Sequence, residues 1–138
     1  MPEGLTRHRI GDYFERVDEA IAMAVMYTAN HLEVTAIIAL TESGSTARWM
    51  SRIRSDIPIY ALTPHAATSR RVTLYRGVYP VPFWAEHSAG GPYRDVFDTL
   101  LSRKLAEVGD FVIVTKGDVE GVSGGTNAMT IVQVTEAG

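Results

Sequence analysis

Short apolar runs alternate with helical segments along this chain, and the alternation constrains the fold more than any other feature. The runs VTAIIAL (34–40) and IPIYALT (57–63) are apolar at nearly every position, which is typical of strands buried on both faces of a parallel sheet. Helical periodicity and helix-ending signals predict helices at 15–32, 46–54, 65–77 and 93–108. Three further strands are expected at 78–83, 111–115 and 128–134, the last antiparallel or at an edge. This order predicts a three-layer α/β/α sandwich around a mainly parallel sheet.

The length of the chain fits one domain. Its 138 residues match the commonest size of a single compact domain, and no internal repeat divides them. Residues 1–14 are mixed and polar and contain Gly4 and Gly11, so we expect an N-terminal arm or linker there. Residues 15–138 are expected to form the domain itself.

Composition excludes several classes of function. The chain has no cysteine, so disulfides, thiolate catalysis and thiolate metal sites are excluded. The net charge is −3 without a long run of one sign, which argues against a nucleic-acid partner held by bulk charge. No stretch reaches the roughly 18 apolar residues of a membrane span, and the N-terminus lacks the apolar core of a signal peptide. We therefore expect a cytoplasmic location and no membrane partner.

The loop TESGST, Thr41 to Thr46, is the first candidate binding site. Ligands of open α/β sheets lie beyond the carboxyl ends of strands, and a loop entering a helix offers backbone N–H groups to an anion. Gly44 lets the backbone approach a ligand closely. Up to four hydroxyl groups are available, on Thr41, Ser43, Ser45 and Thr46. The sequence therefore favours a phosphate site without lysine.

Two observations compete with that interpretation of the loop. Ser45 or Thr46 would also serve as an ordinary N-cap of the following helix. The Glu42 carboxylate would repel an anion. From the residues alone, both the phosphate site and the simple cap therefore stay open.

A second loop, 116–127, is expected at the same edge of the sheet. Its glycine-rich part contains Ser123, Gly124, Gly125 and Thr126 and would fold over a ligand, or would simply be a flexible hairpin connection. Trp84 begins a further loop, where its ring would stack on a base or sugar or anchor the loop.

No residue pattern indicates catalysis or a metal site. There is no G-x-S-x-G motif, and the four histidines lie far apart without the spacing of metal ligands. Glu15, Asp18 and Glu19 would fall in the first turns of the first helix, where acidic side chains suit the helix dipole. Nothing resembles a general acid paired with a base. We therefore predict no catalytic residue and no metal ligand.

Three ordered segments resemble the C-terminal, regulatory domain of pyruvate kinase, from about Arg7 to Val134. They are EAIAMAVMYTANHLEVTAIIALTESGSTARWMSRIRSDIPIYALT, TLYRGVYPV and GDFVIVTKGD…SGGTNAMTIVQV. The resemblance implies a five-stranded mixed sheet and a domain separate from the barrel that transfers phosphate from phosphoenolpyruvate to ADP in glycolysis. It also implies that catalysis, Mg²⁺ and K⁺ belong to that barrel, so this chain would be inactive alone, without a cofactor of its own.

The resemblance further implies an effector site. Loop 41–46 matches the family's loop that grips a phosphate of the activator. Glu42 and Ser45 stand where members responsive to fructose 1,6-bisphosphate often have lysine and arginine. The T-E-S-G version resembles the bacterial branch activated by AMP or sugar monophosphates such as ribose 5-phosphate or glucose 6-phosphate. Residues 121–127 match the family's effector loop, and 84–92 fall where further effector contacts lie.

The resemblance also implies partners. The family's C-terminal domains meet across a tetramer interface, so we expect the barrel domain and further copies of this chain as partners. Three rival functions stay open: a stand-alone phosphometabolite-binding domain without a barrel, a small phosphatase or hydrolase, and a purely structural module that binds nothing.

Overall fold

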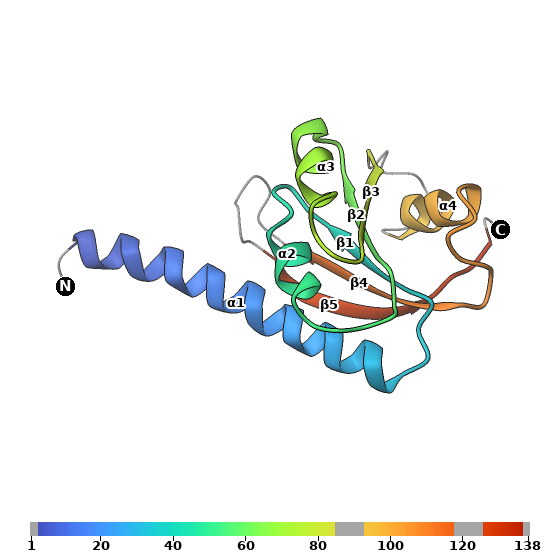
Figure 1. Ribbon diagram of the computed structural model, residues 1–138, viewed down its shortest axis with the longest axis horizontal. Helices are drawn as coiled ribbons and strands as arrows, with labels where there is room; N and C mark the ends of the chain where they lie inside the picture. The colour runs from blue at the N-terminus through green and yellow to red at the C-terminus, as the bar shows by residue number, and fades with distance from the viewer. Residues whose placement is uncertain (1–2, 85–92, 118–125, 137–138) are drawn as a thin grey trace.

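A five-stranded mixed sheet with the strand order β3-β2-β1-β4-β5 forms the centre of the molecule (Figure 1). The computed structural model describes residues 3–84, 93–117 and 126–136. The strands are β1 (Ala36–Leu40), β2 (Ile59–Thr63), β3 (Val78–Pro82), β4 (Phe111–Gly117) and β5 (Thr126–Gln133). β1 pairs in parallel with β2 and β4, β2 pairs in parallel with β3, and β5 is antiparallel to β4. The predicted mainly parallel sheet and its antiparallel last strand are confirmed.

Helices cover both faces of this sheet, as the three-layer prediction requires. They are α1 (Glu3–His31), α2 (Ser45–Ser51), α3 (Ala66–Val72) and α4 (Arg94–Ser102). Ile37 and Ala39 of β1 pack with residues of α1, α2 and α3, whereas Ile38 packs with α4 on the opposite face. The alternation follows from strand geometry, in which successive side chains point to opposite faces. Both faces are apolar, which explains why β1 reads as a continuous apolar run.

The first helix is longer than the sequence analysis predicts. α1 begins at Glu3 rather than near Glu15, so the expected arm is helical. An isolated glycine within a helix costs only about 1 kcal/mol relative to alanine, and no proline interrupts this segment, so Gly4 and Gly11 do not end it. In Figure 1 the N-terminal turns of α1 extend well beyond the sheet. The division of the chain into an arm and a domain stays a prediction.

The other predicted helices are correct in place but too long. α2 ends at Ser51 rather than Arg54, and α3 ends at Val72, with Thr73 as its C-cap, rather than at Gly77. Gly77 instead has a φ of 73° in the turn before β3. A positive φ suits glycine wherever a chain reverses, so the residue marked a turn but not the end of the helix.

The register of the sheet places the candidate loops at one edge. Leu40, the last residue of β1, lies opposite Leu62 of β2, and Thr115 of β4 lies opposite Ala39. Because these three strands are parallel, the segments after β1, β2 and β4 all leave the sheet at its carboxyl edge.

Candidate functional site

The loop from Thr41 to Thr46, called the TESGST loop below, is ordered by hydrogen bonds of its own. The Gly44 N–H donates to Thr41 Oγ1 at 2.7 Å, and the Ser45 N–H donates to Ser43 Oγ at 3.3 Å. A hydroxyl that accepts a hydrogen bond keeps its own proton for another acceptor. Among the residues that the structure describes, the Thr41 and Ser43 hydroxyls donate to no partner. These two side chains are therefore oriented by the backbone and can still donate to a ligand.

Glycine is needed at position 44 for a structural reason that the sequence did not show. Its φ is 84°, in the left-handed region, and a Cβ built on it would lie 2.8 Å from Val72 Cγ1 of α3. The residue therefore allows α3 to pack closely against the loop. The prediction that Gly44 also lets the backbone approach a ligand closely stays untested.

The hydroxyls of Ser45 and Thr46 turn toward α1. Ser45 Oγ donates to Asp18 Oδ2 at 2.8 Å, and Thr46 Oγ1 donates to Asp18 Oδ1 at 3.4 Å. Neither residue caps α2: its N-cap is Gly44, without a side-chain capping bond. A phosphate contact through these two side chains would require their bonds to Asp18 to break.

The next helix along the chain, α3, supplies a cation that the sequence analysis missed. Arg71 Nη1 donates to the Ser43 carbonyl oxygen at 2.8 Å, and Thr68 Oγ1 donates to the Glu42 carbonyl oxygen at 2.7 Å. The signal was the segment HAATSRR, which follows β2 and so leaves the same edge as the TESGST loop. Arg71 thus places a guanidinium beside the loop.

The Glu42 carboxylate is paired with the ring of His65, through Nε2. Both side chains are exposed. The His65 ring thus contacts one oxygen of the carboxylate from which the sequence predicted repulsion of an anion. No hydrogen bond joins Ser43 Oγ to His65 in this part of the described chain, so the nucleophile and base needed by a hydrolase are not in contact.

Most of the second candidate loop lies outside the described residues. Ser123, Gly124 and Gly125 belong to the part on which the structure gives nothing. Thr126 is the first residue of β5, and its backbone pairs with Gly117 at the end of β4. The connection therefore starts and ends at the expected edge of the sheet.

Trp84 lies just beyond β3 and is 65% exposed. In the described ranges it has no ring or hydrogen-bond partner. β2 separates β3 from β1 in the sheet, so at least one strand lies between Trp84 and the TESGST loop. A ligand would have to extend across the end of β2 to contact both this indole and the loop hydroxyls.

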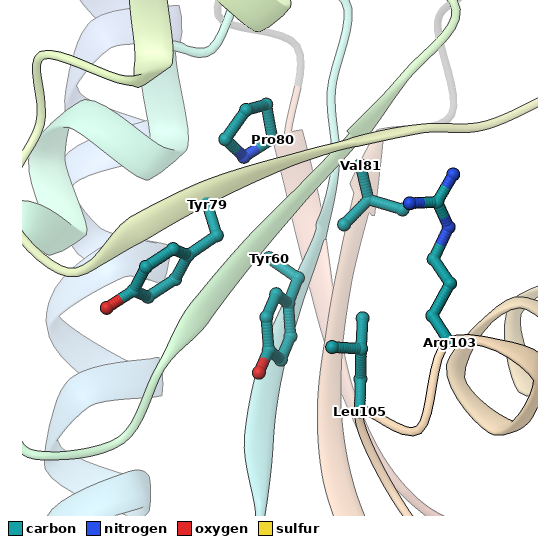
Figure 2. Close-up of a pocket in the computed structure, with 6 residues that line it drawn as sticks. All are labelled: Tyr60, Tyr79, Pro80, Val81, Arg103 and Leu105. Atoms are coloured by element: carbon teal, nitrogen blue, oxygen red, sulfur yellow. The ribbon is translucent and has the colours of Figure 1, made fainter.

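A concave region, the tyrosine groove, lies on the α4 face of the sheet and has a volume of about 470 Å³ (Figure 2). It is lined by Tyr60, Tyr79, Pro80, Val81, Arg103 and Leu105. Tyr60 and Tyr79 are register neighbours on β2 and β3, with ring centroids 6.0 Å apart and planes tilted by 43°. Burial, and to a smaller extent the neighbouring Tyr79, raises the pKa of Tyr60.

A tight turn at the end of α4 forms the other wall of the tyrosine groove. Lys104 has a φ of 59°, and its N–H donates to the Leu101 carbonyl oxygen at 3.1 Å, while the Leu105 N–H donates to that of Leu100 at 2.8 Å. This pair of bonds is the Schellman motif, which usually has glycine at the left-handed position. In Figure 2, Arg103 and Leu105 lie together on one side of the groove. This region was not predicted from the sequence, because its residues belong to β2, β3 and the turn after α4 and meet only in the fold.

Two absences hold for the described part of the chain. No three side chains of His, Asp or Glu gather there in a way that would hold a metal ion. No helix there is both long and apolar enough to cross a membrane.

Comparisons with known proteins place the chain beside one family. The family model described as pyruvate kinase, alpha/beta domain, matches residues 19–132. A pyruvate kinase of Buchnera aphidicola subsp. Baizongia pistaciae is 44% identical over 97% of this chain and 28% of its own length. Pyruvate kinase II of Salmonella typhimurium is 44% identical over 94% of this chain and 27% of its own length. The chain thus spans little more than a quarter of the length of these relatives.

Proposed function

This chain belongs to the pyruvate kinase alpha/beta domain family, and from that premise we propose that it is the allosteric effector-binding and oligomerisation domain of a pyruvate kinase. The full enzyme would transfer phosphate from phosphoenolpyruvate to ADP in glycolysis. The chemistry, with Mg²⁺ and K⁺, would belong to the barrel domain. This chain would bind the activator and contact further copies of itself.

One observation carries the effector-binding part of the proposal. The hydroxyls of Thr41 and Ser43 and the guanidinium of Arg71 meet at one loop on the carboxyl edge of the sheet. Phosphate oxygens accept hydrogen bonds from hydroxyl and guanidinium groups, and the charged guanidinium forms the stronger bonds. The loop is already ordered before a ligand arrives, which lowers the entropic cost of binding.

The charges around the loop favour a ligand with one phosphate. Among the described residues, Arg71 is the cation bonded to the TESGST loop, and the loop itself carries the Glu42 carboxylate. A second phosphate would need further cations. We therefore propose AMP or a sugar monophosphate as the activator rather than fructose 1,6-bisphosphate, with loop 116–127 closing over it and Trp84 as a further contact.

Activation would follow from unequal binding to two arrangements of the enzyme. A ligand shifts such an equilibrium only by the difference in its affinity for the two states. Arg71 and Thr68 of α3 donate hydrogen bonds to the TESGST loop, so a change in the loop on ligand binding would also affect the elements that pack around it.

The test is an NMR amide-shift titration of this chain with AMP, ribose 5-phosphate, glucose 6-phosphate and fructose 1,6-bisphosphate. We expect saturable shifts at Ser43, Gly44 and Arg71, with a monophosphate binding more tightly than the bisphosphate. Shifts confined to other parts of the chain would contradict the proposed site. No shift with any of the four would favour a purely structural module.

Two variants of α3 separate local contact from overall charge. Arg71→Gln removes the guanidinium bonded to the loop, and we expect about tenfold weaker binding, as for one lost hydrogen bond to a charged group. Arg70→Gln removes the same charge from the neighbouring exposed residue and should leave the affinity within about twofold, as for a surface charge. Equal losses of affinity in both variants would show that Arg71 acts through long-range attraction and not through contact with the ligand. Ser43→Asp, which adds a charge at the site, should abolish binding with the fold intact.

A further inference from the structure

Asp18 is a buried carboxylate on the apolar face of α1. It lies four residues before Ala22 on the helix face that also includes Val25, Met26 and Ala29, all of which are in the core. Asp18 itself is fully buried. A carboxylate in such a place is strongly unfavourable unless hydrogen bonds replace its water. It is therefore not one of the helix-terminal acids that the sequence analysis expected, because α1 begins fifteen residues earlier, at Glu3.

Two consecutive residues of α2 donate to this carboxylate. Ser45 Oγ bonds one oxygen at 2.8 Å and Thr46 Oγ1 bonds the other at 3.4 Å. These residues form the first turn of α2, directly after the TESGST loop. Each oxygen of one side chain on α1 is thus connected to the segment that ends the proposed phosphate site.

The bonds decide which hydroxyls of the loop face a ligand. Thr46 is buried against α1, and both its proton and that of Ser45 are donated to Asp18. The Thr41 and Ser43 hydroxyls are held instead by backbone N–H groups of the loop, which leaves their protons for an external acceptor. If Asp18 moved, the first turn of α2 would lose the bonds that set this division.

We propose that Asp18 is a positioning residue that couples α1 to the TESGST loop. The seating of α1 and the geometry of the loop then change together, because one carboxylate joins them across 27 residues of sequence. The ligand side of this inference rests on the proposed function. The coupling itself is a property of the protein without ligand, and so it is tested separately.

The experiment is amide hydrogen exchange of the ligand-free chain, compared for wild type, Asp18→Asn and Ser45→Ala. We expect at least about tenfold faster exchange in both variants, in residues 17–25 of α1 and 42–48 of the loop and α2 together, as for loss of a hydrogen bond to a charged group. The matched control is Ser51→Ala, since within the described ranges Ser51 Oγ bonds only the Arg48 carbonyl oxygen of its own helix. Its exchange in α1 should equal that of the wild type.

Three outcomes overturn the coupling: faster exchange in only one of the two segments, no change beyond that of Ser51→Ala, or additive effects in the double variant Asp18→Asn/Ser45→Ala. Residues joined by one interaction give non-additive effects, so the double variant should exchange no faster than Asp18→Asn alone. If Asp18→Asn does not fold, amide exchange in Ser45→Ala and Thr46→Val still tests the coupling, because both variants keep the carboxylate.

A ligand arm keeps this inference apart from the proposed function. With ribose 5-phosphate present, the wild type should gain protection in α1 as well as in the loop, and Ser45→Ala should gain it in the loop alone. Failure of the wild type to bind would count against the proposed function, while the ligand-free exchange would still judge the coupling. Protection of α1 that persists in Ser45→Ala would overturn the coupling.

Discussion

The TESGST loop and the tyrosine groove lie beside the same sheet, but they are built in different ways. The loop consists of six consecutive residues, and hydrogen bonds to α1, to α3 and within the loop fix nearly every polar group. The tyrosine groove combines side chains from β2, β3 and the turn after α4, and its shape depends on packing. The polar region thus consists mainly of one short segment, and the apolar region combines distant segments.

The contrast extends to the backbone. Each region contains one residue in the left-handed conformation, Gly44 in the loop and Lys104 beside the groove. At the first, glycine is required because Val72 fills the space of a Cβ. At the second, a lysine occupies a position that glycine would fit better. The left-handed position in the loop therefore holds the residue that suits it best, whereas the left-handed position beside the groove does not.

The largest expected effect is on the loop. Gly44→Ala forces a Cβ into the left-handed region and against Val72 Cγ1, so we expect the free energy of unfolding to fall by about 2–4 kcal/mol. Urea unfolding measures it. Gly77→Ala is the control, because Gly77 also has a positive φ but no atom within 4 Å of its Cβ position, and it should cost only about 1 kcal/mol. Equal costs would show that packing against α3 does not matter.

A smaller effect of opposite sign is expected beside the tyrosine groove. Lys104→Gly relieves the left-handed strain at the end of α4 but adds freedom to the unfolded chain, so we expect a net stabilisation of about 0.5 kcal/mol. Arg103→Gly, one residue earlier and with a φ of −92°, should destabilise the protein instead. Thermal unfolding compares them. A destabilised Lys104→Gly would mean that the turn is not strained, and the contrast with Gly44 would fail.

The smallest effect is a pH dependence confined to the tyrosine groove. The pKa of Tyr60 is raised from 10.0, first by burial and then by Tyr79. The stability from neutral Tyr60 is thus fully present below pH 10.0 and is lost as the pH rises through the folded-state pKa. Tyr60→Phe should lose less stability than the wild type above that pH, as alkaline unfolding curves would show.

Tyr79→Phe serves as the control for that pH dependence. Absorbance titration of tyrosinate should find the pKa of Tyr60 still raised but closer to its ordinary value, because only the smaller cause is removed. Return of this pKa to its ordinary value would make the charge of Tyr79, rather than burial, the main cause.

The sequence predicted the order of elements and the place of the loop for the same reason. Apolar runs such as VTAIIAL report burial on both faces of a sheet, and the residues after them must lie at its edge. The contacts of Asp18 with α2 could not be predicted, because Ser45 and Thr46 lie 27 and 28 residues away from it and Asp18 was assigned to the start of a helix. Tyr60 and Tyr79 became neighbours only once the strand register was known. Local patterns thus predicted the elements, but not the contacts between them.

The length of α1 gives its contact with the loop a mechanical meaning. At 1.5 Å per residue, Glu3 lies about 22 Å along the helix axis from Asp18, so a tilt of about 10° at Asp18 displaces the far end by about 4 Å. Conversely, a force of a given size at that end exerts a torque on the Asp18 bonds that grows with the distance. With the proposed coupling, a small rearrangement of Ser45 and Thr46 would therefore be accompanied by a larger displacement of the N-terminal end of α1.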